Sequence, residues 1–305
     1  MEELENIKII SGIDTLYFFI ETNEDYDSLF LDVLDQYEDY IDRFTRLEAD
    51  YKNEDIAVNI GKCTFTHIGM AQGFYWFKDI NGFFRFGIKD KRKNRGLHNI
   101  QVQLTADGIY SVGIKSILEL IDSIFTEFSM GQKLITRADL NAFTTYDFST
   151  ISKDMFVTRK KQFTEFKAIG SKNSLSTIYV GRKPFLLRMY DKKQELIANG
   201  KKEELMSEYL ASHGIDISSG EPLWNIEFEL HRDHLKSFSI SSVDELLTNA
   251  KAIFEKCMED VRLIDIDTLT QKMIDGGHAN RAETMSIWDR IKTSYDISEF
   301  IQSTI

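Results

Sequence analysis

The chain has 305 residues, of which 42% are hydrophobic and 28% charged, so it holds enough apolar material for a sizeable core. This composition excludes a disordered chain, and the low count of two prolines excludes a Pro-rich or collagen-like architecture. No stretch approaches the roughly 20 apolar residues of a membrane span, and the acidic start MEELENIKII lacks the features of a secretory signal. We therefore expect a cytoplasmic protein without a membrane partner.

The net charge of -12 is unevenly distributed. Residues 1–55 carry 17 acids against four bases, whereas residues 157–202 carry 12 bases against three acids. A second basic run, KDKRKNR, occupies residues 89–95. Because clustered Lys and Arg bind phosphates, the acidic total does not exclude a nucleic-acid partner.

In the first half, an amphipathic helix is predicted over residues 26–51, where apolar positions recur at three-to-four spacing. Short β-like runs follow at residues 57–68, 73–79, 83–89 and 98–105, and we expect them to form antiparallel hairpins. Helical spacing returns over residues 112–128, and residues 134–143 are predicted to be a strand.

The second half repeats this order loosely. Strands are predicted at 164–168, 175–180, 185–190 and 223–231, and helices at 192–212, 243–257 and 284–302. The pattern predicts an α+β fold with a largely antiparallel sheet, flanking helices and two loosely similar halves. We expect an N-terminal half over residues 1–132, a second half over 133–262 that carries the candidate site, and a C-terminal helical extension over 263–305.

Polar side chains gather on one face of three predicted strands, because successive side chains of a strand point to opposite faces. They are Arg137, Asp139 and Asn141; Arg188 and Tyr190; and Asn225, Glu227, Glu229 and His231. A solvated sheet face explains such alternation without any function. Carboxylates beside an Arg and a Tyr also suit a divalent cation and a phosphate next to a nucleophile. The Tyr190 hydroxyl, with an ordinary pKa of about 10, needs a nearby metal or cationic cluster to ionise.

Other candidate residues have simpler explanations. We expect His231 and His234 to lie at the surface or to support the site rather than to bind metal. Cys63 and Cys257 lack zinc-ligand spacing and a nearby catalytic His, so we expect them in the core. The motifs GxGxxG, GxxxxGK[ST] and HExxH are absent, which removes the usual nucleotide-binding and zinc-protease interpretations.

Three motifs resemble the Rep_trans-type rolling-circle replication initiators, a family that includes plasmid and filamentous-phage initiators and related conjugative relaxases. TRADLNAF at residues 136–143 resembles the T-R-x-D strand of the family. STIYVGRKPFLLRMYDKKQE at residues 176–195 resembles its T-x-Y-x-G strand turning into an R-x-Y-D/E-K strand, and WNIEFELHRD at residues 224–233 resembles its Trp-led strand. With VQLTADG at 102–108, the resemblance extends over residues 100–233.

The resemblance implies a replication initiation protein that nicks one DNA strand at an origin, keeps the 5'-phosphate on a tyrosine and later rejoins the strand. It assigns catalysis to Tyr190, Arg188 and Lys192. It assigns a Mg²⁺ or Mn²⁺ site to Asp139 with Glu227 or Glu229.

One position departs from the family pattern. Phe143 occupies the place of a second family Asp, and Asn141 replaces an Ala. Either Asp147 compensates or the metal site has fewer carboxylates.

The partner implied is origin DNA, single-stranded or in a hairpin, and we expect a homodimer that recruits a host helicase. The expected DNA contacts are Lys91, Arg92, Lys93, Arg95, Arg159, Lys160, Lys161, Arg182 and Lys183. Two alternatives stay open: a non-catalytic phage or mobile-element DNA-binding or regulatory protein of the same fold, and a metal-dependent phosphohydrolase that uses water in place of tyrosine.

Overall fold

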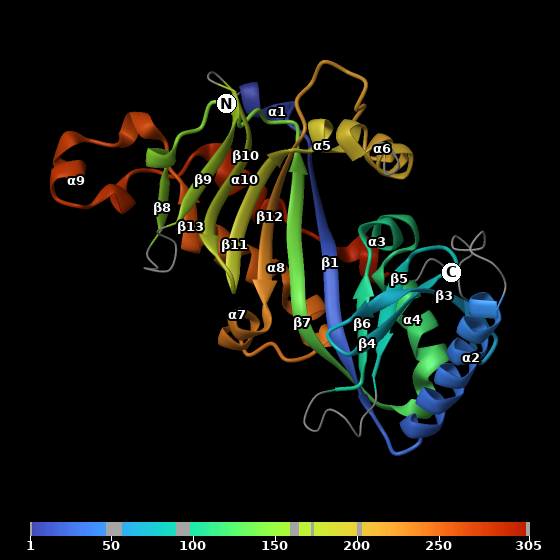
Figure 1. The fold of residues 1–305 in the computed structure, drawn as a ribbon. Coiled ribbons are helices and arrows are strands. Elements are labelled where there is room, and N and C mark those ends of the chain that lie inside the picture. Colours follow the sequence, from blue (N-terminus) through green and yellow to red (C-terminus); the bar gives the residue numbers. More distant parts are fainter. Residues whose placement is uncertain are drawn as a thin grey trace. The chain divides into compact units, whose positions relative to one another are not determined.

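A computed structural model describes residues 2–46, 57–89, 98–158, 165–171, 174–199 and 203–302. Their strands form an α+β fold with a large antiparallel sheet of 11 strands, in the order β2-β3-β4-β5-β6-β1-β7-β12-β11-β10-β9 (Figure 1). The sheet is not closed into a barrel, and β8 pairs with β13 in a separate two-stranded sheet. The predicted fold class is confirmed. None of the helices in the described ranges is long and apolar enough to cross a membrane.

The chain divides into two compact units. Unit 1 comprises Met1–Asp14, Arg137–Ile240 and Leu247–Ser298; unit 2 comprises Thr15–Thr136, Ser241–Leu246 and Glu299–Ile305. The long strands β1 (Ile9–Thr22) and β7 (Ser129–Thr144) contribute residues to both units.

Unit 2 packs its helices against one face of its strands. Its elements are α2 (Tyr26–Arg46), β2 (Ala57–Ile60), β3 (Cys63–Ala71), β4 (Phe74–Asp79), β5 (Phe84–Ile88), β6 (Ile100–Leu104), α3 (Ala106–Val112), α4 (Ile114–Phe125) and η2 (Thr126–Phe128). Phe86 of β5 meets Phe125 of α4 edge to face at 5.2 Å between ring centroids. The Tyr26 hydroxyl of α2 donates to the Lys89 carbonyl at 2.8 Å. Phe30 of α2 meets Tyr75 of β4, which shares the parity of Phe77, and Phe77 stacks on Phe86, so α2 and α4 lie on the same face.

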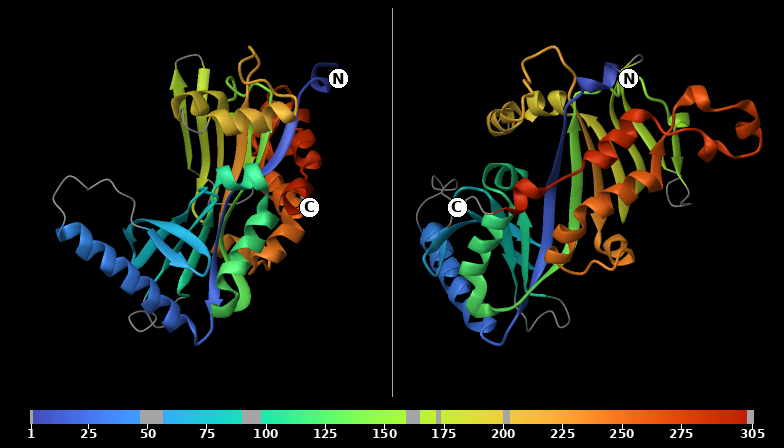
Figure 2. Two further views of the ribbon diagram at one scale, coloured as in Figure 1. Left: turned by 90° about the vertical axis from the view of Figure 1, so that its right-hand side faces the viewer. Right: turned by 180° about the vertical axis from the view of Figure 1, so that it is seen from behind.

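Unit 1 contains most of the remaining elements. They are α1 (Glu2–Glu5), η3 (Lys153–Met155), β8 (Phe156–Thr158), β9 (Phe166–Ser171), β10 (Ser174–Arg182), β11 (Phe185–Asp191), α5 (Lys192–Asn199), α6 (Glu203–Ser212), β12 (Trp224–His231), α7 (Arg232–Ser237), α8 (Val243–Asp260), β13 (Val261–Leu263), η5 (Ile266–Thr268), α9 (Gln271–Asp275), η6 (Ala279–Arg281) and α10 (Ser286–Ser294). Helix α8 begins in unit 2, and α11 (Ser298–Ile301) lies mostly in unit 2. Helices α8 and α10 lie across the back of the unit 1 strands (Figure 2). Phe228 of β12 packs against Phe254 of α8 at 5.5 Å, and the Trp288 indole N–H donates to the Met258 carbonyl. The apolar face of these strands is therefore the core face.

Both units use the same strand order. Unit 2 contains β3-β4-β5-β6-β1, and unit 1 contains β9-β10-β11-β12-β7. In unit 2, β6 is followed by the short helix α3 and the longer helix α4. In unit 1, β12 is followed in the same way by the short helix α7 and the longer helix α8. The expectation of two loosely similar halves is confirmed at the level of topology.

Several predicted boundaries were wrong. The strand β1 was missed, because its residues Leu16 to Ile20 are apolar on both faces and show no alternation. The helix expected at 112–128 is preceded by a separate helix, α3, which ends at Gly113 with a φ of 81°. The long helices expected at 192–212 and 284–302 are each described as two helices, and Asp296 caps the second of the latter pair by accepting from the Ser298 amide.

Candidate active site

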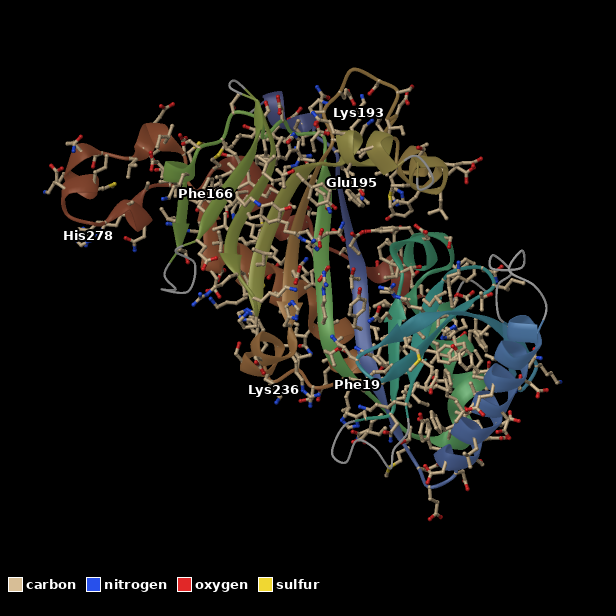
Figure 3. The ribbon with its side chains drawn as sticks, viewed as in Figure 1. Phe19, Phe166, Lys193, Glu195, Lys236 and His278 are labelled. Atoms are coloured by element: carbon tan, nitrogen blue, oxygen red, sulfur yellow. The ribbon has the colours of Figure 1, made fainter. Side chains whose placement is uncertain are left out.

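The candidate site lies on the polar face of β7, β12 and β11, which are neighbours in unit 1. The backbone register places Glu227 opposite both Asn141 and Arg188, and Tyr190 opposite Asn225. Because these positions share one parity, their side chains lie on the face opposite the α8 core face. Helix α5, which carries Lys193 and Glu195, begins where β11 ends (Figure 3). The structure thus brings together the polar residues that the alternation had grouped.

Arg188 stands at the convergence point of three buried carboxylates. Its Nη2 lies 3.0 Å from Asp139 Oδ2 and 3.6 Å from Glu229 Oε2, and it also donates to Glu227 Oε1. The side chains of Asp139 and Glu227 are each only 1% exposed. Burial opposes the charged guanidinium, but the three carboxylates outweigh it and raise the pKa of Arg188. The Arg188 Nε atom is buried without a hydrogen-bond partner in the described part of the chain.

Glu229 is held in its ionised form. His231 Nε2 lies 2.6 Å from Glu229 Oε1, and the Arg137 and Lys183 cations lie at 3.3 Å from its oxygens. Burial alone would raise the pKa of Glu229, but His231 and the cations, Arg188 included, lower it below its ordinary value.

Glu227 experiences the opposite environment on the same strand. Burial first, and then the negative charges of Asp14 and Asp139, raise its pKa well above the ordinary value, although Arg188 opposes them. Two carboxylates with pKa values pushed in opposite directions are typical of sites that divide acid-base roles. Glu227 is therefore the better proton acceptor, and Glu229 the more permanent negative charge.

Tyr190 is in direct contact with Glu227 and with Asn225. Its hydroxyl accepts a hydrogen bond from Asn225 Nδ2 at 2.8 Å and donates to Glu227 Oε2 at 3.4 Å. Burial, followed by the charge of Glu227, raises the pKa of Tyr190 well above 10. These surroundings favour the neutral phenol, so an attack by Tyr190 requires its proton to move to a neighbour as the new bond forms.

Asp14 belongs to the site and was missed by sequence reasoning. Its Oδ1 atom is buried and has no hydrogen-bond partner among the described residues. Burial raises the pKa of Asp14, the charge of Lys192 opposes this, and Asp139 adds to it. The available signal was an acid inside the apolar run IISGIDTLYFF of residues 9–19. Asn225 was also undervalued, although it bonds both the Tyr190 hydroxyl and the Asn141 side chain.

Lys192 lies at the edge of the site. It is 6% exposed, its Nζ pairs with Glu195 at 2.8 Å, and the same nitrogen lies 5.7 Å from the ring centroids of both Tyr190 and Phe143. Phe143 is fully buried, facing Asn225 in the strand register. Asp147 is exposed and accepts from the Ser149 amide at 2.8 Å, so its carboxylate is engaged in a turn.

The predicted DNA contacts are only partly visible. Arg182 and Lys183 lie at the turn between β10 and β11 with side chains 67% and 66% exposed, and they pair with Glu165 and Glu229 respectively. The others, Lys91, Arg92, Lys93, Arg95, Arg159, Lys160 and Lys161, lie outside the described residues.

The carboxylates have the right chemistry for a hard divalent cation, since Asp139, Glu227 and Glu229 supply oxygen ligands. Asp14 adds an oxygen, Oδ1, that has no hydrogen-bond partner among the described residues. Their arrangement is less open, because Arg188 occupies the point where they converge. Within the described ranges, no group of three or more His, Cys, Asp or Glu side chains is arranged to hold a metal ion. A bound cation and the Arg188 ion pairs would therefore compete for the same oxygens.

No family model matches the chain, and no curated protein matches it. Among solved structures, the chain is similar to a rolling circle replication initiator protein from Geobacillus stearothermophilus, with a TM-score of 0.50 and 14% sequence identity. The match covers 94% of this chain and 96% of that chain. At this identity the likeness shows the fold, which extends over nearly the full length of both proteins.

Proposed function

We propose that the chain is a replication initiator that nicks and rejoins one DNA strand through a 5'-phosphotyrosine link. The observation that carries the proposal is the position of the Tyr190 hydroxyl, hydrogen-bonded to Asn225 and Glu227 beside Arg188. The fold likeness to a replication initiator supports the same class of function. The test is incubation with single-stranded origin DNA and Mn²⁺, followed by a denaturing gel that separates free protein from a covalent adduct.

In the proposed step, the Tyr190 oxygen attacks the phosphorus of one phosphodiester and the bond to the 3'-oxygen breaks. Glu227 accepts the phenol proton, and the leaving 3'-oxygen takes a proton from water. The hydroxide that remains takes the proton from Glu227, so no net proton is gained or lost. The Nε–H of Arg188, which has no partner within the described ranges, is a donor for a phosphoryl oxygen, whose charge grows in the transition state. Rejoining reverses these steps, so no nucleotide is consumed.

A divalent cation is a separate part of the proposal. Asp139, Glu229 and Glu227 would hold Mg²⁺ or Mn²⁺, which when bound polarises the phosphoryl oxygen. The residues of the chain then keep their own tasks: Asn225 orients the phenol, and Lys192 adds positive charge near Tyr190.

Changing Glu227 to Gln should lower the adduct yield by about 100-fold or more, the usual contribution of a positioned base. The same change should leave the protein at least as stable at pH 8. A raised pKa means that the folded state binds the Glu227 proton more tightly than the unfolded state, so stability is lost as pH rises from about 4.5 through the folded pKa. The glutamine side chain of the variant cannot ionise, so the variant does not lose this stability as pH rises. Thermal unfolding temperatures of both proteins at pH 5 and pH 8 measure the difference.

Glu229→Gln is the matched control, because it lies two residues away and has the opposite shift. A lowered pKa makes the ionised Glu229 stabilising above its unfolded pKa, so this variant should unfold at a lower temperature at pH 8. Equal destabilisation by both variants would contradict the division of roles.

Metal binding is tested without an activity assay. The electron paramagnetic resonance signal of free Mn²⁺ is followed as protein is added, and the signal falls as Mn²⁺ binds. Asp139→Asn should weaken uptake by about tenfold or more, because a charged ligand is lost. Asp147→Asn is the control, since that carboxylate is exposed and bound to Ser149. Equal effects of the two changes, or no uptake by the unaltered chain, would remove the metal from the proposal.

A non-catalytic DNA-binding protein is the second candidate. It is favoured by the buried Phe143 at a position where the resembled family has an acid, and by Arg188 among the carboxylates. It predicts retention of DNA without an adduct. Homodimer formation, helicase recruitment and the basic DNA contacts stay predictions.

A further inference from the structure

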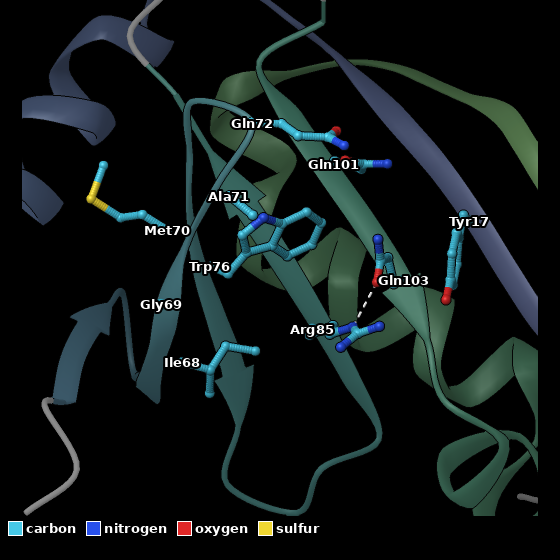
Figure 4. A pocket seen from close by; sticks show the side chains of 10 residues that line it. All are labelled: Tyr17, Ile68, Gly69, Met70, Ala71, Gln72, Trp76, Arg85, Gln101 and Gln103. Atoms are coloured by element: carbon cyan, nitrogen blue, oxygen red, sulfur yellow. Dashed lines mark hydrogen bonds between the residues drawn. The ribbon is translucent and has the colours of Figure 1, made fainter.

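Unit 2 has a pocket of about 460 Å³ on the face of its strands that α2 and α4 do not cover (Figure 4). The side chains that matter below come from four strands: Tyr17, Trp76, Arg85, Gln101 and Gln103. None of these residues belongs to the candidate active site, which is built entirely from unit 1.

The repeated topology gives the pocket residues on β1, β4, β5 and β6 counterparts in unit 1. A short helix starts directly after β6 and after β12, with Thr105 and His231 as the cap residues. Counting two residues back from each cap aligns Gln103 with Glu229. The buried residues of the two strands agree with this alignment: Ile100, Val102 and Leu104 correspond to Ile226, Phe228 and Leu230.

Two residues further back, Gln101 aligns with Glu227. In unit 1, Glu227 faces Arg188 on the neighbouring strand. In unit 2, Gln101 faces Gly87 in the same register. An amide and a glycine thus stand where the active site has a carboxylate and its guanidinium partner.

The other neighbour shows the same replacement. Glu229 faces Asp139 of β7, whereas Gln103 faces Tyr17 of β1. All three proposed metal ligands therefore have uncharged counterparts in unit 2. This pocket lacks the carboxylates with which the candidate active site would bind a divalent cation.

Gly87 makes room for an aromatic ring. A Cβ at Gly87 would lie 3.0 Å from Trp76 Cε2 and 3.0 Å from Phe74 Cβ, tighter than most real Cβ contacts, so these neighbours would have to shift. The absent side chain lets the Trp76 indole lie across the strand, where it lines the pocket. Trp76 faces Gly87 as Tyr179 faces Arg188, so both units have an aromatic residue at this position. In unit 2 the indole lies against the position that Arg188 fills in unit 1.

The polar groups around Trp76 are suited to a neutral, flat ligand attached to an anion. Side-chain amides offer both donors and acceptors, as nucleobase edges do. Of the described residues that line the pocket, Arg85 alone is charged, and its Nε donates to Gln103 Oε1 at 2.6 Å. The exposed guanidinium lies beside the amides and suits a phosphate next to the base.

We propose that this pocket binds an unpaired nucleobase of single-stranded DNA, stacked on Trp76 and hydrogen-bonded by Gln101 and Gln103. The identity of the ligand as DNA rests on the proposed function, but the site is independent of the Tyr190 reaction. Stacking on an aromatic ring tolerates any base, so the pocket retains a strand without reading its sequence.

Tryptophan fluorescence tests the proposal on the intact chain. Trp224 and Trp288 are 2% and 0% exposed, so quenching by an added oligonucleotide reports mainly on Trp76. We expect an oligothymidylate of about 12 nucleotides to quench the signal, and an abasic strand of equal length to bind more weakly. The Trp76 variants lack the reporting indole, so their affinity is measured by fluorescence anisotropy of a dye-labelled oligothymidylate. Trp76→Leu should weaken oligothymidylate binding by about fivefold or more, and Trp76→Phe by less.

The control is Ile80→Ala, which removes an 81% exposed apolar side chain outside the pocket. Equal affinity for the abasic and thymidylate strands would overturn base recognition, as would unchanged binding by Trp76→Leu. Quenching without a covalent adduct contradicts the proposed nicking alone. An adduct without quenching contradicts this inference alone.

Discussion

Replacing Tyr190 with Phe is expected to abolish the covalent DNA adduct while the protein stays folded and retains DNA. The hydroxyl is the only nucleophilic atom removed, and its loss leaves the Asn225 amide without the bond of 2.8 Å. A lost neutral hydrogen bond costs about 1 kcal/mol, far less than would unfold a domain. The measurement is a denaturing gel with end-labelled single-stranded DNA, together with a thermal unfolding curve.

Tyr179→Phe is the matched control for Tyr190→Phe. Tyr179 lies on β10 and faces Arg188 in the register, so it is the next tyrosine of the same sheet. Its loss should leave the adduct intact. Adduct formation by Tyr190→Phe, or its loss in Tyr179→Phe, would reassign the nucleophile.

Replacing Arg188 with Met is expected to destabilise the protein by about 3–5 kcal/mol, because removing one partner of a buried ion pair leaves the other charges uncompensated. Asp139 and Glu227 are almost fully buried beside it. Urea unfolding at pH 8 measures the loss. Added Mn²⁺ should recover more stability in this variant than in the unaltered chain, since the freed carboxylates then accept the cation.

Arg182→Met is the control for that experiment. Arg182 pairs with Glu165, but both side chains are more than half exposed, and such pairs contribute about 1 kcal/mol or less. Similar losses in the two variants would show that the buried ion pairs of Arg188 contribute no more to stability than an exposed pair.

The sequence predicted the site best where one face of a strand is apolar. In β12 the apolar residues Ile226, Phe228 and Leu230 alternate with Asn225, Glu227 and Glu229. Both the strand and its polar face could therefore be predicted from the sequence. The motifs then assigned chemistry to that face. What alternation could not supply was the burial of the carboxylates, because exposure depends on neighbours that are distant in sequence.

The dependence on residues distant in sequence also explains why the surroundings of Asp14 and Arg188 were not predicted. Asp14 lies in a strand with apolar residues on both sides, so it had no predicted face or partner. Arg188 was assigned to catalysis without a named partner, and the structure pairs it with Asp139 and Glu227 across two neighbouring strands. Only the register of those strands determines which ions meet.

The repeated strand order has a consequence for stoichiometry. The two units share a topology, yet the position of Tyr190 corresponds in unit 2 to Lys89, whose amine cannot form a phosphotyrosine. Under the proposed function, one chain can carry at most one DNA end at a time. A second strand transfer therefore needs another chain or the release of the first end, and an adduct of one oligonucleotide per chain is the ceiling in a saturating experiment.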